Sequence, residues 1–556
     1  MLKLKRKKNA DCRLEADFVI HDSTAPVRRP QLKISSWVYL VSLICFLPFS
    51  LVSTLGAQNV SVQERAANGI SLARQGKLSA AERELRAAVK EAPSVAVYRA
   101  QLGSILGLEG KWQESLGAFQ KSVHLAPENL DFRRELAAVQ WQLNLFSDAQ
   151  SNLLYVLKKR PSDPGAILLL GLVKEKLGDY AKAAQLLDSQ FKLVAVEPER
   201  TVSLFHSVVE SGQHDKIAKV VDVLKLHAND KPWADAIIRC TQIAMLGGDL
   251  QTAEVLFSLI PAENSVRVAA GFQLAKLFYS HSQVSRAEEL LLKLKSQGVD
   301  NADIEVLLGN CFESEHQSEQ AIAAYRRAIA ADPSRVERYE DLIFLFLYQH
   351  RIEDALLVVN QALAIAPNDS RPWVWKGNVD LRRNAYNDAV ESYTHALRLD
   401  KENSDALYGV AAAYYATGQS DAAIAQCKAG ISQFPDDARF YLSYADILLA
   451  SPDAMQQHAQ ARNLLDKALK FAPHSAQAHY LLGQIALQEG QLKEAEEYLL
   501  RSLSFDSERS KTHFALSRVY RRTGRADEAE KEFALYEKLK EKEESGGSSL
   551  GTSTTQ

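Results

Sequence analysis

Cysteine is scarce in this chain and is never closely paired. Five cysteines occur in 556 residues, and none forms a C-x-x-C pair. Such spacing builds neither a disulfide framework nor a zinc site, because both need several cysteines at short, regular intervals. We expect isolated buried thiols instead: Cys12, Cys45, Cys240, Cys311 and Cys427.

An excess of positive charge is also missing. The 66 lysine and arginine residues are outnumbered by 69 aspartate and glutamate residues, which gives a net charge of −3. A nucleic-acid binder uses a broad positive field, so we expect no nucleic-acid partner. The hydrophobic content of 46% is that of folded protein, and 556 residues exceed one ordinary globular core. Several domains or an array of repeats must follow.

Complete catalytic and cofactor-binding signatures are absent. Neither H-E-x-x-H nor G-x-G-x-x-G occurs, and "GLEGKW" lacks the earlier glycine of a phosphate loop. Ser549 lies in "GSSLG", but this polar tail has no strand and helix to form a nucleophile elbow. His206, Glu210 and His214 recur at four-residue intervals, which would place them on one helix face as metal ligands. Gly212 interrupts that helix and no fourth ligand is evident, so surface or helix-end histidines are favoured. We predict no enzyme, no cofactor, no metal and no small-molecule substrate.

The first 57 residues differ from the rest. Residues 1–33 are a basic leader, and no charged residue occurs from Ile34 to Gln63. Residues 34–57 are apolar enough to be a signal peptide or a single transmembrane helix. Positive charge before this segment should keep the leader in the cytoplasm and send the following residues across. We expect an exported or inner-membrane-anchored protein, most simply in the bacterial periplasm; whether the segment is cleaved stays open.

Small and large residues recur in steps of 34 residues from Ser61 onward. Ala389, Ala355 and Ala321 are 34 apart, and Gly377 and Gly309 are 68 apart. A period in this range is typical of a stacked array. Each unit reads as two amphipathic helices that approach closely at small residues, turn at glycine and end at proline. The turn glycines are Gly76, Gly110, Gly178, Gly248, Gly418, Gly490 and Gly524. The closing prolines are Pro93, Pro127, Pro161, Pro333, Pro367 and Pro435.

Small residues in the first helix and alanine in the second mark where the two helices meet, and large residues fill the space between units. The small first-helix residues are Gly69, Gly103, Gly171, Gly309, Gly377 and Gly483. The alanines are Ala81, Ala149, Ala183, Ala321, Ala355, Ala389, Ala495 and Ala529, and the large residues are Phe119, Tyr325, Tyr393 and Phe533.

This pattern resembles the tetratricopeptide repeat, a 34-residue helix–turn–helix unit, with 13 or 14 units between Ser61 and Tyr536. The resemblance implies an all-α fold, a right-handed α-solenoid whose first helices line a concave groove. It also implies binding of peptides or partner proteins. We expect an N-terminal arm over residues 61–197, a divergent repeat and hinge over 198–231, a C-terminal arm over 232–537 and a disordered tail over 538–556.

The resemblance also implies which residues face the groove. Carried over position by position, they are Phe344, Tyr348, Asn378, Arg382, Tyr408, Tyr415, Tyr480 and Phe514. The aromatic ones would anchor peptide side chains, or would pack on the next repeat. The last unit adds Arg518, Arg521, Arg522 and Arg525, with Lys511 nearby, to capture a carboxylate or to form a solvated cap.

The carboxylate clamp of some family members is incomplete in this chain. Asn310 and Asn378 match its asparagine position, but Val306 and Val374 stand where its lysine would be.

Two functions follow from these features. The first is a non-catalytic scaffold that holds proteins in its groove and supports assembly in the bacterial cell envelope. The alternative is an accessory subunit that binds carbohydrate or a glycan-processing enzyme.

Overall fold

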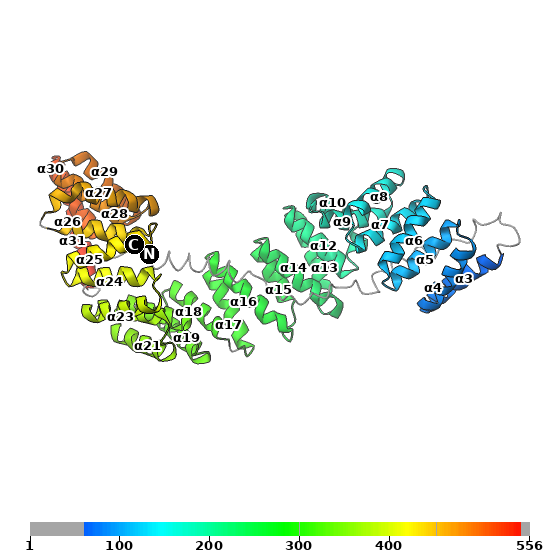
Figure 1. Ribbon diagram of the computed structural model, residues 1–556, viewed down its shortest axis with the longest axis horizontal. Helices are drawn as coiled ribbons and strands as arrows, with labels where there is room; N and C mark the ends of the chain where they lie inside the picture. Colours follow the sequence, from blue (N-terminus) through cyan, green and yellow to red (C-terminus); the bar gives the residue numbers. More distant parts are fainter. Residues whose placement is uncertain (1–59, 300, 452, 546–556) are drawn as a thin grey trace. The chain divides into compact units, whose positions relative to one another are not determined.

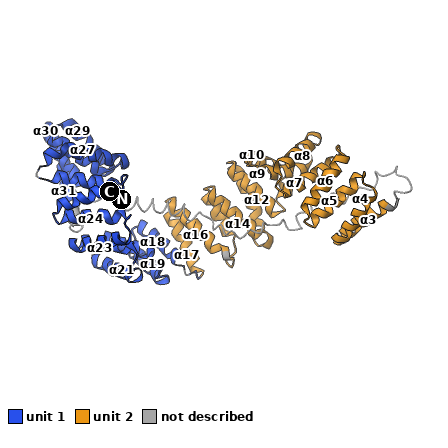
Figure 2. Ribbon diagram, in the orientation of Figure 1, with its two compact units in different colours: residues 1–18, 298–556 blue, residues 19–297 orange. Residues whose placement is uncertain are grey.

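The computed structural model describes residues 60–299, 301–451 and 453–545, and within these residues it contains helices and no strand (Figure 1). Contacts divide the chain between Gln297 and Gly298 into two compact units (Figure 2). We call their described parts the N-terminal unit, residues 60–297, and the C-terminal unit, residues 298–545. The predicted leader (1–33) and apolar segment (34–57) lie outside the described residues.

Each unit contains seven helix pairs. In the N-terminal unit the pairs are α3 (Val60–Arg74) and α4 (Leu78–Glu91), α5 (Ala96–Leu108) and α6 (Trp112–Leu125), α7 (Leu130–Gln142) and α8 (Phe146–Lys159), α9 (Pro164–Lys176) and α10 (Tyr180–Ser189), α12 (Pro198–Glu210) and α13 (Ile217–Leu226), α14 (Ala234–Leu246) and α15 (Leu250–Ser258), and α16 (Ser265–Ser280) and α17 (Val284–Ser296). A single extra turn, α11 (Phe191–Val194), precedes α12, and 3-10 turns precede α13 (His214–Lys216) and α14 (Lys231–Trp233).

The C-terminal unit continues the alternation without an extra turn. Its pairs are α18 (Ala302–Ser314) and α19 (Ser318–Ala331), α20 (Glu337–Tyr348) and α21 (Ile352–Ile365), α22 (Ser370–Arg382) and α23 (Tyr386–Leu399), α24 (Ser404–Ala416) and α25 (Ser420–Gln433), α26 (Ala438–Ala450) and α27 (Ala454–Phe471), α28 (Ala476–Gln488) and α29 (Leu492–Phe505), and α30 (Ser510–Arg522) and α31 (Ala526–Ser545). The expected all-α array of helix–turn–helix units is confirmed, with fourteen pairs in the described residues.

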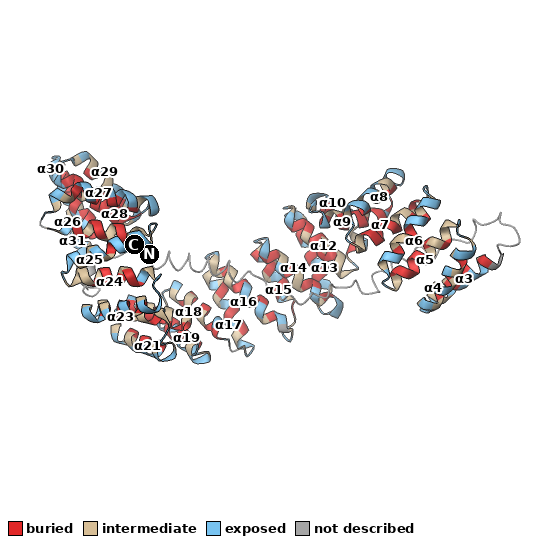
Figure 3. Cartoon of the chain, viewed as in Figure 1, coloured by how far each residue is buried: buried red, intermediate tan, exposed pale blue. Residues whose placement is uncertain are grey.

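Glycine and alanine lie where the two helices of a pair come closest. A β-carbon added at Gly377 would lie 2.6 Å from Cε1 of Tyr393, the large residue sixteen positions later. The same ring also faces Gly409 of the next pair, so Tyr393 fills the space between two units. All eight predicted alanines of the second helices are buried. Figure 3 shows the result: buried residues gather where helices face each other, and exposed ones lie on the outside. Phe533, in the last pair, is only partly buried.

Turns and helix ends follow the predicted residues. All seven predicted turn glycines have positive φ, between 74° and 80°. The same turn position is filled by other residue types in five pairs, also with positive φ: Asn144, Ser282, His316, His350 and Asn384. Proline follows two residues after the last helical residue, as Pro367 does after Ile365. The three cysteines in the described residues, Cys240, Cys311 and Cys427, are buried thiols as expected.

Side chains tie each first helix to the turn before it. The residue six positions after a closing proline donates a hydrogen bond to that proline's carbonyl oxygen. The donors are Arg99, Arg133, Tyr339, Trp373 and Tyr441. The sequence predicted that these prolines end helices, but not that their carbonyl oxygens accept hydrogen bonds. The six-residue spacing to the donor is nevertheless visible in the sequence.

The divergent repeat replaces small contact residues by large ones. Phe205 stands where the neighbouring α9 has Gly171, and Ile217 stands where α10 has Ala183. Both large residues are buried, and α12 packs more extensively on α10 and α14 than on its own partner α13. The expected hinge at residues 198–231 lies here, inside the N-terminal unit rather than at the division between Gln297 and Gly298. Its flexibility stays a prediction.

The C-terminal tail also differs from expectation. Disorder was expected from residue 538, whereas α31 continues to Ser545. Its last turns alternate glutamate and lysine, which favours helix through pairs three and four residues apart. Lys542 on this extension pairs with Glu508 at 2.9 Å.

Candidate functional site

Contacts between helices show which side of the C-terminal unit is the inner one. The first helices of consecutive pairs from α20 to α30 contact each other, and consecutive second helices of this unit make no comparable contact. Helices on the inside of a bend lie closer together than those outside. We therefore call the solvent-facing side of α18, α20, α22, α24, α26, α28 and α30 the inner surface.

Two predicted groove residues are engaged in packing inside the array. Asn378 accepts a hydrogen bond of 2.7 Å from the Tyr393 hydroxyl, as Asn310 does from Tyr325. Tyr408 is largely buried and packs edge-on against Phe440 of the next pair, with a ring separation of 6.0 Å. Burial raises the pKa of the Tyr408 phenol above its ordinary value. Asn378 and Tyr408 thus support neighbouring helices, the structural role that the sequence left open for them.

Tyr348 and Arg382 are available for contact. The Tyr348 side chain ends α20 and is 75% exposed, and Arg382 is exposed at the end of α22. Phe344, one turn before Tyr348, is half-buried. Phe514 is 39% exposed and packs on Tyr536 at a ring separation of 5.0 Å.

A cluster of aromatic and charged side chains joins α24, α26, α28 and the start of α30. Tyr480 is buried, and its hydroxyl accepts a hydrogen bond from Gln484. Burial raises the pKa of Tyr480 to about 12; Arg509 opposes this shift, and the Asp446 carboxylate adds to it. Burial also raises the pKa of Tyr415, and Asp446 again adds to the shift. The charge of Asp446 thus acts on both predicted residues, Tyr415 and Tyr480.

Asp446 was missed by sequence reasoning. It stands 68 residues after Asn378, which was assigned to the groove, so the same counting would have found it. The sequence analysis did not select this aspartate, because the repeat pattern does not specify an aspartate at that position.

The arginines of this surface differ in how well their charge is balanced. Arg371 pairs with Asp369 of its own helix cap and with Glu337 of the preceding pair, and these carboxylates raise its pKa. Arg439 repeats the arrangement with Asp437 and Asp405.

Arg509, the N-cap residue of α30, is balanced less closely, by Asp506 and by the charge of Asp446. Its ion pair with Asp506 is long, at 3.6 Å, and its Nε is buried without a hydrogen-bond partner in the described part of the chain. Burial lowers the pKa of Arg509, the direction expected of an incompletely balanced cation.

The remaining predicted arginines lie on α30 or in the turn that follows it. Arg518 is exposed on the inner surface. Arg521 lies over the Phe533 ring at 5.2 Å, and Arg522 donates a hydrogen bond of 2.8 Å to the Leu487 carbonyl oxygen. Arg525 pairs with Glu496 and Glu528. Part of the basic set therefore secures the last repeat, and Arg518 is left facing solvent.

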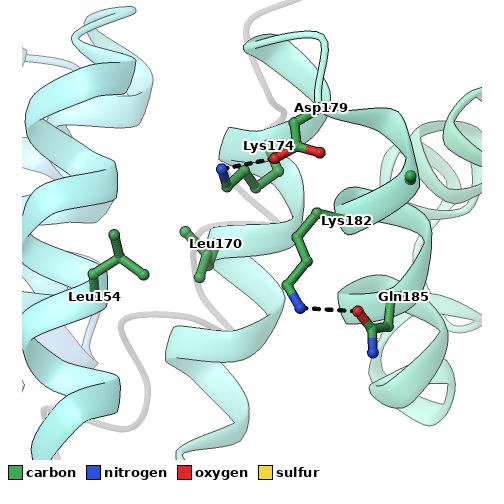
Figure 4. Close-up of a pocket in the computed structure, with 7 residues that line it drawn as sticks. Leu154, Leu170, Lys174, Asp179, Lys182 and Gln185 are labelled. Atoms are coloured by element: carbon green, nitrogen blue, oxygen red, sulfur yellow. Dashed lines mark hydrogen bonds and ion pairs between the residues drawn. The ribbon is translucent and has the colours of Figure 1, made fainter.

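An open hollow of about 510 Å³ lies on the N-terminal unit over α8, α9 and α10 (Figure 4). Lys174 pairs with Asp179 at 2.8 Å, and Lys182 donates to Gln185 at 2.9 Å. Its charged groups are thus already satisfied within the hollow. Its lining residues are Leu154, Leu170, Lys174, Asp179, Ala181, Lys182 and Gln185.

The histidines weighed as metal ligands have other surroundings. His206 lies 2.9 Å from the Glu175 carboxylate and packs edge-on against Tyr180. His214 is exposed in the 3-10 turn before α13. No group of three or more metal-binding side chains occurs among the described residues. Within the same residues, every helix is too short or too polar to cross a bilayer.

The helix pairs and their inner surface define an α-solenoid of helical hairpins, and sequence comparison gives its family. Two models of the tetratricopeptide repeat match the chain, one over residues 380–447 and 454–510 and the other over residues 67–130, 134–189 and 272–336. Together these segments cover more than half of the chain. The protein belongs to the tetratricopeptide repeat family.

Individual relatives are distant. The chain is 22% identical over 416 residues to cellulose synthase operon protein C of Pseudomonas fluorescens (strain SBW25). The matched region covers 74% of this chain and 28% of that protein. It is 24% identical over 181 residues to protein O-mannosyl-transferase TMTC3 of Mus musculus, covering 32% and 20%. The chain thus spans less than a third of either relative. Among solved structures, the APC/C hetero-tetramer Cut9-Hcn1 is 13% identical with a TM-score of 0.38, covering 88% of this chain and 96% of that chain.

Proposed function

We propose that this protein is a non-catalytic scaffold that holds partner proteins or peptides on the inner surface of its repeats. The carrying observation is the exposure of side chains such as Tyr348 and Arg382 on first helices whose other faces are fully used in packing. A large aromatic ring on a rigid helix contributes contact area at little entropic cost. A stack that buries its own apolar faces leaves this surface free to vary.

The proposed setting is the bacterial cell envelope, with the repeats outside the cytoplasm. Support comes from the basic leader followed by the uncharged stretch from Ile34 to Gln63. Cell fractionation with mass spectrometry of the mature N-terminus tests the compartment. Recovery of the intact leader in a soluble cytoplasmic fraction would contradict it.

Affinity capture from envelope extracts tests the scaffold. The full chain is compared with a double variant, Tyr348→Ala with Arg382→Glu, and with Leu357→Ala on the second helix α21, where Leu357 is 59% exposed. All three positions are exposed, so each variant should fold. We expect specific partners to be retained by Leu357→Ala and lost by the double variant. Capture of no partner, or equal capture by all three proteins, would count against the proposal.

A second candidate is an accessory subunit that binds carbohydrate or a glycan-processing enzyme. It is favoured by the relatives, since cellulose synthase operon protein C and an O-mannosyl-transferase are both named for glycan chemistry. Calorimetric titration with a soluble β-glucan separates the two ideas. Heat of binding that the double variant abolishes supports the second.

A further inference from the structure

The basic end of the inner surface, at α28 and α30, is chemically unlike the rest of that surface. At the start of α22 and of α26, Arg371 and Arg439 are each held between two carboxylates. Arg509, two residues before the repeat position that Arg371 and Arg439 occupy, is balanced by Asp506 at 3.6 Å and by the charge of Asp446. Its Nε is buried without a hydrogen-bond partner among the described residues, and Arg518 is exposed.

Both guanidinium groups act on one aromatic side chain. Arg509 sits over the Tyr480 ring, with Cζ 5.3 Å from the ring centroid, and both Arg509 and Arg518 act electrostatically on the Tyr480 phenol. Gln484 is bound to the same hydroxyl and adds an amide. Arginine donors, an amide and a flat ring around one point suit a carboxylate on a short acidic segment.

A solvated end cap explains this less well. A cap needs exposed charge, and Arg521, Arg522 and Arg525 already supply it while contacting Phe533, Leu487 and Glu496. It gives no reason for the buried Nε of Arg509 to lack a hydrogen-bond partner among the described residues, because a buried donor left unsatisfied is destabilising.

We propose that the α28–α30 end of the inner surface binds an acidic peptide segment of a partner protein, with Arg509 and Arg518 holding a carboxylate next to Tyr480. This inference rests on the proposed scaffold function and specifies the chemistry of its partner. Asp446, on the α26 side of the cluster, limits the site by repelling acidic residues placed beyond it.

The test uses the full chain and fluorescein-labelled oligoglutamate, with oligoglutamine and oligolysine of equal length as comparisons. We expect anisotropy to report binding of oligoglutamate alone, weakened when salt is raised to about 0.5 M. Arg518→Glu should weaken binding on the order of tenfold or more, and Arg518→Lys should restore part of it. Lys493→Glu makes the same charge change at an exposed position on the second helix α29 and should leave binding unchanged.

Circular dichroism confirms that each variant folds. The proposal is overturned if oligoglutamate does not bind, if oligoglutamine binds equally, or if Lys493→Glu weakens binding as much as Arg518→Glu. Tighter, Arg518-dependent binding of an anionic polysaccharide would overturn the peptide assignment. If partners are still captured through Tyr348 and Arg382 while oligoglutamate does not bind, the proposed scaffold function stands and only the proposed acidic partner is rejected.

Discussion

Replacing Gly377 by alanine probes the contact that sets the spacing of the repeats. The new β-carbon would lie 2.6 Å from Cε1 and 2.7 Å from Cζ of Tyr393. The ring cannot retreat, because its other side faces Gly409 at an equally short hypothetical β-carbon distance of 2.5 Å. Its hydroxyl is also held by Asn378 at 2.7 Å. The helices must therefore move apart, or the ring must leave its rotamer.

Opposing effects set the size of the change. Overfilling a packed core costs about 1–3 kcal/mol, and weakening the Tyr393–Asn378 hydrogen bond costs about 1 kcal/mol. Alanine regains roughly 1 kcal/mol over glycine through its helix propensity. We expect Gly377→Ala to lower the free energy of local unfolding of α22 and α23 by about 1–3 kcal/mol.

Native-state hydrogen exchange measures this locally, which suits a stack whose units open separately. Gly117→Ala is the matched control, since Gly117 lies within α6 and a β-carbon there meets no atom within 4 Å. Only propensity acts at that site, so protection of α6 should rise by about 0.5–1 kcal/mol. In the background Tyr393→Ala, Gly377→Ala should likewise become stabilising. If Gly377→Ala stabilises the native chain as Gly117→Ala does, close approach is not what glycine provides here.

Three further changes have definite signs. Ser282→Gly should stabilise α16 and α17 by about 1 kcal/mol, because serine is strained at φ 60°. Asn384→Gly, at the same φ, should stabilise its helix pair less, because asparagine tolerates this conformation. Equal gains in stability for the two variants in thermal unfolding would contradict this reasoning. Burial raises the pKa of Glu135 from 4.5 to about 7, so the folded state holds a proton that the unfolded chain releases, and stability from this group falls as pH rises through that interval. Glu135→Gln should remove on the order of 1–3 kcal/mol of the loss seen in urea unfolding between about pH 5 and about pH 8, and an unchanged loss would refute the assignment. Amide hydrogens of residues 198–231 should exchange faster than those of α9 and α10, because Phe205 keeps α13 from packing closely on α12. Uniformly slow hydrogen exchange would contradict the predicted hinge.

The fold could be predicted because its determinants are local and periodic. Gly377, Ala389 and Tyr393 each reduce to a distance along the chain, and the structure places them in contact. Turns filled by non-glycine residues were harder to predict. His316 and His350 occupy the glycine position with positive φ, a conformation that is not predicted from the residue type histidine.

The candidate site was predictable only in outline. Counting positions assigned Tyr408 and Tyr480 to the groove equally, yet Tyr408 packs on Phe440 whereas Tyr480 joins a polar cluster. The difference depends on which side chain the next repeat presents, a contact between residues about 30 apart in sequence. Charge balance was equally hidden, because Arg371 and Arg509 both lie near the start of a first helix and only the structure locates their carboxylate partners.

Variation at one repeat position indicates where specificity resides. The same place on the first helices from α20 to α30 holds Phe344, Asn378, Ala412, Asp446, Gln484 and Arg518, at intervals of 34 residues and one of 38. Twelve positions after the small residue, by contrast, most pairs keep alanine, because helix approach permits little else. A position that changes from apolar to amide to acid to base presents a different chemistry at each step along the inner surface. A bound segment is therefore read in one register: its acidic residues belong at Arg518, and a shift of two repeats would bring them to Asp446.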